Sequence, residues 1–171
     1  DADHLDIYGT LEEYQKAFKE FASQVSRTLI VKYGLDITAD DTKARILSYS
    51  YDNPSADYHA ANAKPDEVGH YIFDLVYPGG VIENIRVGIP GWVNVENSVA
   101  AAAVCLCHGV SPEAVKEAIG TYSGVKRRLE VHLNTPRLSY IDDYAHHPKE
   151  LESAISSMRG IFPGRKLTAI F

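Results

Sequence analysis

Cysteine is scarce in this sequence. Only Cys105 and Cys107 occur among the 171 residues, two positions apart in an apolar segment. Two cysteines are far too few for the disulfide framework that stabilises small secreted domains, and on a helix their side chains would point roughly 200° apart. We expect both to be buried, reduced thiols, which is typical of a cytoplasmic protein.

Long apolar runs and an excess of positive charge are also missing. No apolar stretch reaches the ~18–20 residues that cross a bilayer, and no secretory signal peptide is recognisable. The 17 basic residues are outnumbered by 23 acidic ones, which gives a formal net charge of −6. We therefore expect neither a membrane nor a nucleic-acid partner, although a local basic cluster can still bind a small anionic substrate.

The remaining composition is that of a globular protein. Apolar residues make up 45% and charged residues 23% of the chain, close to the averages for folded domains. The length suits one domain or two small ones. The sequence starts at "DADHLDIYG" and stops in "KLTAIF", an apolar run typical of a buried strand. Because a chain rarely ends in mid-strand, we expect this sequence to be a piece of a longer protein.

The first part of the sequence predicts one amphipathic helix followed by several strands. Thr10 and Glu13 form a capping box at the start of a helix over residues 10–25. Strands are expected at 28–33, 45–51 and 57–63, and a β-hairpin joins 71–77 to 81–89 through Gly79-Gly80. The apolar residues of the helix share one face: Leu11, Tyr14, Phe18, Phe21 and Val25.

Two helices and a change of pattern follow the hairpin. The first helix runs from residue 92 to about Gly109 with a stripe of small apolar residues, and the second begins after the N-cap Ser111. Residues 122–128 have no apolar periodicity, so we predict a domain boundary there, with domains at 1–124 and 125–171. Beyond it the sequence predicts strands at 129–134 and 138–143, a helix at 148–159 and a strand at 166–171. This alternation indicates an α/β fold with a partly parallel sheet.

The densest chemistry lies in "IDDYAHHPKEL", residues 141–151. Pro148 suits the first position of a helix, so residues 142–147 occupy the loop between a strand's carboxyl end and a helix's amino end, where α/β proteins bind ligands. Asp143 can accept hydrogen bonds from a ribose diol, and His146 or His147 can donate to a carboxylate or phosphate. Helix capping by these residues is the alternative. A zinc site is disfavoured because no further ligand lies at suitable spacing.

Three other segments carry candidate ligand contacts. "GVKRRLE" places three basic residues at 126–128, and guanidinium groups fit phosphate oxygens well; a solvated charge run is the alternative. "PGWVNVEN" puts Asn94 and Asn97 on one helical face, where an amide can read an adenine edge, with helix capping as the alternative. "DADHLD" holds His4 between carboxylates, and alone such a histidine is more often structural than a metal ligand.

In this order, "DADHLDIYG", "GWVNVENSVAAAAV", "GVKRRLE" and "IDDYAHHPKEL" resemble the Mur ligase family from end to end of the chain. Members are ATP-dependent amide ligases that build the peptidoglycan stem peptide in the cytoplasm through an acyl phosphate. They have three domains: a UDP-substrate-binding domain, a central ATPase and a Rossmann-like C-terminal domain. The resemblance implies a truncated central domain of helices and a mixed sheet with a β-hairpin, followed by the start of the third domain.

The resemblance also implies roles for individual residues. His4 would be a ligand of Mg²⁺, and Arg128 and His146 would take part in catalysis. The Tyr in "DDYAHHP" favours the members that add L-alanine to UDP-N-acetylmuramate over those that recycle a murein tripeptide, where Phe is expected. The nucleotide contacts would be Asn94 and Asn97 at the adenine, Arg128 at the phosphates and Asp143 at the ribose, while Tyr144, His146 and His147 would face the muramoyl and amino-acid side.

The sequence departs from the family pattern in two respects. At Val93 many members carry His, so one adenine contact is absent or replaced, and no GxxxxGK[ST] phosphate loop occurs anywhere in the chain. We therefore expect this segment to be inactive alone and to risk self-association through exposed sheet edges. The recycling ligase and a non-catalytic nucleotide-binding module both remain alternatives.

Overall fold

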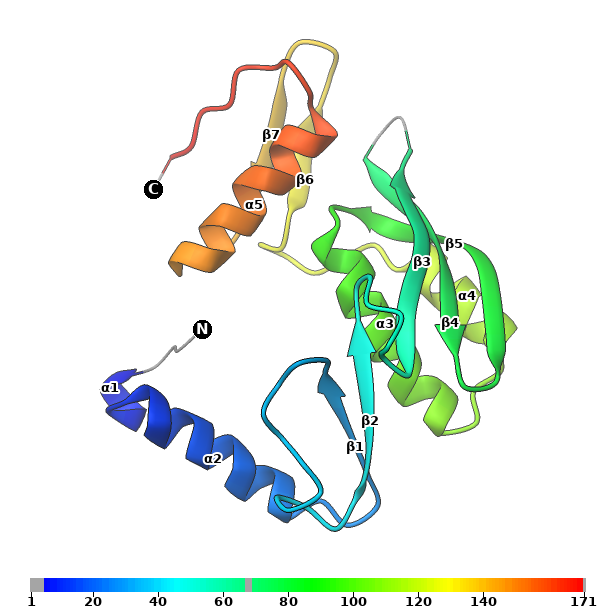
Figure 1. Ribbon diagram of the computed structural model, residues 1–171. Helices are drawn as coiled ribbons and strands as arrows, with labels where there is room; N and C mark the ends of the chain where they lie inside the picture. Colours follow the sequence, from blue (N-terminus) through cyan, green and yellow to red (C-terminus); the bar gives the residue numbers. More distant parts are fainter. Residues whose placement is uncertain (1–4, 67–68, 171) are drawn as a thin grey trace.

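The computed structural model describes residues 5–66 and 69–170 (Figure 1). A five-stranded sheet has the order β1-β2-β3-β4-β5 and is mixed, because β1, β2 and β3 pair in parallel whereas β3, β4 and β5 pair antiparallel. The predicted α/β fold with a mixed sheet and a hairpin is thus confirmed. The strands of this sheet are β1 (Thr28–Lys32), β2 (Arg45–Ser50), β3 (Tyr58–Pro65), β4 (His70–Tyr77) and β5 (Gly80–Pro90).

Helices and a second, smaller sheet complete the fold. The helices are α1 (Leu5–Tyr8), α2 (Leu11–Ser23), α3 (Val93–Cys107), α4 (Pro112–Thr121) and α5 (Pro148–Ile161). Strands β6 (Glu130–Asn134) and β7 (Ser139–Asp142) form an antiparallel hairpin (Figure 1). Among the described residues, none of the helices combines the length and the apolar content that a bilayer crossing requires.

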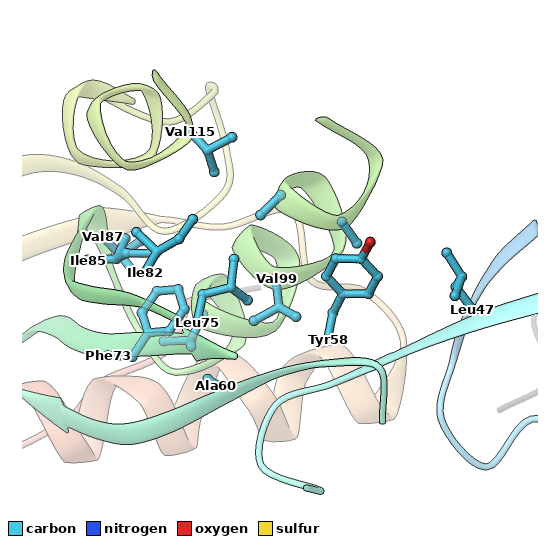
Figure 2. Close-up of a cluster of buried hydrophobic side chains, with 13 residues drawn as sticks. Leu47, Tyr58, Ala60, Phe73, Leu75, Ile82, Ile85, Val87, Val99 and Val115 are labelled. Atoms are coloured by element: carbon cyan, nitrogen blue, oxygen red, sulfur yellow. The ribbon is translucent and has the colours of Figure 1, made fainter. Parts of the chain in front are cut away.

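The main core forms where α3 and α4 pack on the five-stranded sheet (Figure 2). Alternation along β4 buries Phe73 and Leu75, and the predicted stripe of α3 buries Val95 and Val99, all at 1% exposure or less. Ala102 and other small residues on the same helix let α3 approach the sheet closely. The α3 stripe is therefore confirmed, and it fixes the orientation of the polar face of the helix.

Helix α2 begins as predicted, but its apolar stripe is packed only in part. Thr10 Oγ1 accepts a hydrogen bond from the backbone N–H of Glu13 at 3.2 Å, which caps the helix. Phe18 and Phe21 are nevertheless 48% and 63% exposed, and only Ala22 is buried in the helix. Phe18 and Phe21 stay exposed because burial needs an opposing layer; among the described residues, Val25 of the stripe packs on the small cluster around Ala22 and Tyr14 meets the ring of Tyr8.

The cysteine prediction is wrong. Cys105 and Cys107 are free thiols, as expected, but both are exposed. The buried side of α3 is defined by Val95, Val99 and Ala102, and the two cysteines fall away from it near the end of the helix. A 3.3 Å contact between Cys107 Sγ and the hydroxyl of buried Tyr58 links one of the thiols to the core.

The predicted strand at 166–171 is also wrong over its described residues. Residues 165–170 have no regular structure, and Ile170 is 93% exposed. The two strands before it pair antiparallel, with Glu130 opposite Asp142, so the expected partly parallel sheet does not form in this region. An extended segment becomes a strand only when a neighbour takes its backbone hydrogen bonds, and the described residues offer none here.

The two predicted regions touch through small residues. A methyl group at Gly91, just before α3, would lie 2.9 Å from Leu129 Cδ1 and 3.5 Å from Ser157 Oγ. One at Gly69 would come within 2.6 Å of Ile161. Glycine at these points therefore lets α5 and the start of the β6 segment approach the five-stranded sheet closely. Leu129 and Ser157 are buried at this contact, and the Ser157 hydroxyl has no hydrogen-bond partner among the described residues.

Candidate functional site

One pocket of about 870 Å³ lies between α3, α4, the segment 122–129 and α5. Its size falls within the ~300–1,000 Å³ typical of small-molecule sites. Four residues singled out from the sequence line it: Asn94, Asn97, Arg128 and Asp143. They come from segments far apart in the chain, so the fold brings together what the sequence only suggested.

The α3 wall carries two amides in different situations. Trp92 occupies the N-cap position of α3 and makes no capping hydrogen bond with its side chain, so the capping alternative for Asn94 is wrong. Asn94 Nδ2 donates to the carbonyl oxygen of Pro90 at 2.7 Å and is committed to the turn before the helix. Asn97 is exposed, and its Nδ2 reaches Asn94 Oδ1 only at 3.5 Å. Asn97 is therefore the amide better able to meet a ligand.

The backbone on both sides of Arg128 is unusual. Arg127 has φ 60° and Leu129 has φ 48°, a left-handed conformation that non-glycine residues adopt rarely and at a cost of about 1–3 kcal/mol each. Asp143 stabilises it, since its Oδ2 accepts from Leu129 N and its Oδ1 from Ala145 N, both at 2.8 Å. Asp143 therefore has a structural role, because it joins the Arg128 segment to the loop after β7. The sequence motif did not reveal this role.

Two further hydrogen bonds fix the same segment. The backbone N–H of Arg127 donates to Glu130 Oε2 at 2.8 Å, and its carbonyl oxygen accepts from Tyr144 N at 2.8 Å. These bonds hold the main chain that carries Arg128, whose exposed side chain stays movable. Strained, well-supported backbone of this kind is found preferentially at functional sites.

Glu150, in the first turn of α5, was not singled out from the sequence and proves central. Its Oε1 lies 3.6 Å from Arg128 Nη1. Its Oε2 accepts from the backbone N–H groups of His146 at 3.1 Å and His147 at 3.3 Å. Hydrogen bonds from these backbone N–H groups, that of His146 first, and the nearby positive charge of Arg128 lower the pKa of the Glu150 carboxyl. A Glu two residues after Pro148 was the available signal, since Glu at the third helical position is typical of a capping box.

The other candidate residues of the motif, Tyr144, His146 and His147, do not line the pocket. Tyr144 is 50% exposed, with its ring against the guanidinium of Arg127 at 4.6 Å and the ring of His146 at 5.0 Å. His146 Nδ1 lies 2.9 Å from the carbonyl oxygen of Tyr144. Because a carbonyl only accepts, Nδ1 carries the proton, and Nε2 of the neutral ring is an acceptor. His147 occupies the N-cap position of α5, so capping accounts for part of this motif.

A possible metal constellation occurs elsewhere than predicted. His4 lies outside the described residues. Glu130, His132 and Asp142 hold potential ligand atoms within 4.8 Å of one another on the β6–β7 hairpin. Strand pairing brings these three residues together, so their spacing in the sequence could not predict the cluster. Arg127 supplies positive charge there, because its guanidinium Nε lies 3.9 Å from Asp142 Oδ2.

Comparisons with known proteins agree along the chain. Family models match for the Mur ligase middle domain over residues 1–105 and for the Mur ligase, glutamate ligase domain over residues 127–171. The chain is 41% identical over 174 residues to UDP-N-acetylmuramate–L-alanine ligase of Porphyromonas gingivalis, which covers 100% of this chain and 38% of that protein. It therefore spans little more than a third of that relative's length.

Solved structures of similar fold include two ligases. MurF from Acinetobacter baumannii superposes with a TM-score of 0.78 at 25% identity, covering 92% of this chain and 35% of that one. UDP-N-acetylmuramate-alanine ligase MurC from Thermotoga maritima gives a TM-score of 0.76 at 22% identity, covering 94% of this chain and 36% of that one. At this identity the second likeness concerns the fold alone.

Proposed function

The chain belongs to the Mur ligase family, and from this premise we propose that it forms part of a cytoplasmic ATP-dependent amide ligase that joins L-alanine to UDP-N-acetylmuramate. The observation that carries the proposal is the convergence of Asn97, Arg128 and Asp143 on one pocket. The specific amino acid and sugar nucleotide come from the similarity to the Porphyromonas gingivalis enzyme named for them. In this reaction the muramate carboxylate takes the γ-phosphoryl group of ATP, and the alanine amine then displaces phosphate from the acyl carbon.

Residues 1–124 would belong to the central ATPase domain, and residues 125–171 would begin the C-terminal domain. Two features support this division. The family models end and resume at 105 and 127, and the two sheets share no strand pairing. The pocket then lies between two domains, a common position for nucleotide sites, and closure of one domain on the other would complete it.

The chemistry of the pocket fits a nucleoside triphosphate. Asn97, with Asn94 beside it, offers an amide for the adenine edge, and Arg128 offers a planar guanidinium for phosphate oxygens. The carboxylate oxygens of Asp143 each accept one backbone hydrogen bond and keep a second lone pair for a ribose hydroxyl. His4 stays our proposed Mg²⁺ ligand. The ion would neutralise phosphate charge, which Arg128 would share.

The Tyr144–His147 loop would serve the acyl acceptor side. With its Nδ1 fixed on the Tyr144 carbonyl, His146 presents Nε2 as an acceptor that can take a proton from the alanine amine. Tyr144 is half-exposed, and with His147 it would contact the muramoyl or amino-acid group. These groups lie next to the Arg128 segment, so phosphate and acyl acceptor would meet at the edge of the pocket.

Kinetics of the full-length ligase test the proposal. Phosphate release from ATP and UDP-N-acetylmuramate should depend on L-alanine, and Asp143→Ala should raise the KM for ATP severalfold while the enzyme still folds. Release that depends only on murein tripeptide would identify the recycling ligase instead. No phosphate release with either acceptor would point to a non-catalytic nucleotide-binding module. An unchanged KM would remove Asp143 from the ribose role.

Nucleotide binding by the isolated chain provides a second test. The sequence contains no GxxxxGK[ST] loop, and such a loop supplies most of the backbone N–H groups that cradle phosphates. We expect ATP to bind this chain only weakly. Calorimetry showing micromolar affinity would contradict the view that the loop carries most of the binding energy.

A further inference from the structure

Glu150 holds the guanidinium on which nucleotide binding is proposed to depend. Its Oε1 lies 3.6 Å from Arg128 Nη1, and both side chains are partly exposed, at 35% and 55%. Both residues line the same pocket. An anionic ligand that reaches Arg128 must therefore compete with a carboxylate already beside it.

The geometry restricts what can change when a ligand arrives. Asp143 and Glu130 fix the backbone on either side of Arg128 through 2.8 Å hydrogen bonds. The other oxygen of Glu150 accepts from the backbone N–H groups of His146 and His147 and anchors the first turn of α5. Main chain and carboxylate are thus both held, and the movable part is the Arg128 side chain.

We propose that Glu150 is a positioning residue whose carboxylate acts as the resting counter-ion of Arg128 and is exchanged for the phosphates when a nucleoside triphosphate binds. The role rests on the proposed function of the pocket. Without ligand the pair keeps Arg128 over the pocket. With ligand, Arg128 turns to the phosphate oxygens, which offer it more negative charge and bidentate geometry. The exchange weakens the binding of phosphate-bearing nucleotides, which must displace the carboxylate, and leaves the binding of nucleosides unchanged.

The pair sets a modest cost on binding. Partly exposed ion pairs contribute ~0.2–1 kcal/mol, which corresponds to a change in dissociation constant of up to about fivefold. Removing the Glu150 charge should therefore tighten ATP binding by roughly two- to fivefold. A ligand without phosphate does not need Arg128, so its affinity should not change.

The test compares two charge-neutralising variants in the full-length ligase. Glu150→Gln removes the charge but keeps an oxygen that can accept from the His146 and His147 N–H groups, as Gln does in capping boxes. Glu117→Gln removes one charge from the exposed surface of α4, which borders the pocket, without touching its lining. Matching far-UV circular dichroism spectra and a cooperative thermal transition for wild type and both variants verify that the fold is intact. Dissociation constants for ATP and adenosine are measured by calorimetry.

The expected result is a two- to fivefold lower dissociation constant for ATP in Glu150→Gln alone, with no change for adenosine. On an Arg128→Ala background the same substitution should leave the dissociation constant for ATP unchanged, because Glu150 then has no guanidinium to pair with. Unchanged or weaker ATP binding in Glu150→Gln, or equal tightening in Glu117→Gln or with adenosine, would overturn the counter-ion role alone. A wild-type ligase that binds neither ATP nor adenosine would overturn the proposed function, and the role of Glu150 with it.

Discussion

Substitution of Gly88 tests how closely α4, which lines the pocket, packs against the five-stranded sheet. Gly88 lies in β5, next to the C-terminal end of α4. A methyl group there would lie 2.2 Å from the carbonyl oxygen of Tyr122 and 2.9 Å from that of Gly120. Both obstacles are main-chain atoms, so no side-chain rotation can relieve the clash. The Gly88→Ala variant must instead push the end of α4 away from β5.

The distances give the size of the effect. An ordinary contact begins at 3.4 Å, so the Tyr122 carbonyl must retreat by about 1.2 Å, the difference between 3.4 and 2.2 Å. Overpacking of this kind costs about 1–3 kcal/mol. Replacing glycine by alanine would otherwise favour the folded state by about 0.4–1 kcal/mol, so the steric cost dominates. We expect the free energy of unfolding to fall by about 1–2 kcal/mol.

Urea denaturation followed by circular dichroism measures this change. Gly120→Ala is the matched control, since a methyl group there meets only Arg86 O at 3.5 Å and alanine is favoured inside a helix by about 1 kcal/mol. We expect Gly120→Ala to stabilise the chain and Gly88→Ala to destabilise it at an unchanged m-value. A Gly88→Ala variant as stable as the wild type would refute the close approach of α4 to β5.

Three other predictions concern single polar groups. Ser157→Ala should raise the free energy of unfolding by about 1 kcal/mol, because the buried hydroxyl finds no hydrogen-bond partner in the described part of the chain. A lower free energy of unfolding in urea denaturation would contradict this. Burial and the contact with Cys107 raise the pKa of Tyr58 to about 12 from 10.0. The stability that this shift contributes is therefore fully present below pH 10 and is lost as the pH rises towards 12. Urea denaturation at alkaline pH should show a smaller loss of stability for Tyr58→Phe than for the wild type. The lowered pKa of Glu150 contributes stability above pH 4.5 that is lost as pH falls further; Glu150→Gln should flatten this acid-side decline in thermal unfolding scans, and an identical decline would contradict it.

Local patterns in the sequence predict the elements of the fold well. Alternation marked Phe73 and Leu75 as buried, and helical spacing marked Val95 and Val99, because these periodicities come directly from strand and helix geometry. Thr10 capped α2 as its motif indicated. These features depend on neighbours within a few residues, so one sequence suffices to find them.

Features that depend on a distant partner were predicted poorly. Phe18 and Phe21 have the spacing of a buried stripe but stay exposed, and residues 166–170 have strand-like composition without a neighbouring strand among the described residues. Cys105 was expected inside because cysteine is usually buried, yet the orientation of α3 is set by other residues. Apolar character measures a tendency to be buried, and it does not say what is available to cover the residue.

Sequence patterns singled out residues that line one pocket, but they did not show how these residues depend on one another. Arg128 and Asp143 were singled out for separate ligand roles, and both line the pocket. The hydrogen bond from Leu129 N to Asp143 and the ion pair of Arg128 with Glu150 could not be read from the sequence. They arise from left-handed backbone and from the contact of two loops, neither of which leaves a periodic signal.

The change from parallel to antiparallel pairing within the five-stranded sheet has a consequence for folding. Strands β3, β4 and β5 form a meander with short turns, and α3 follows β5 directly. Strands β1 and β2 pair in parallel only after residues 33–44 return the chain to the same end of the sheet. Because closing a longer loop costs more entropy before any contact forms, we expect the folding nucleus to centre on the meander and α3. The parallel strands would then join as a later addition to an assembled edge.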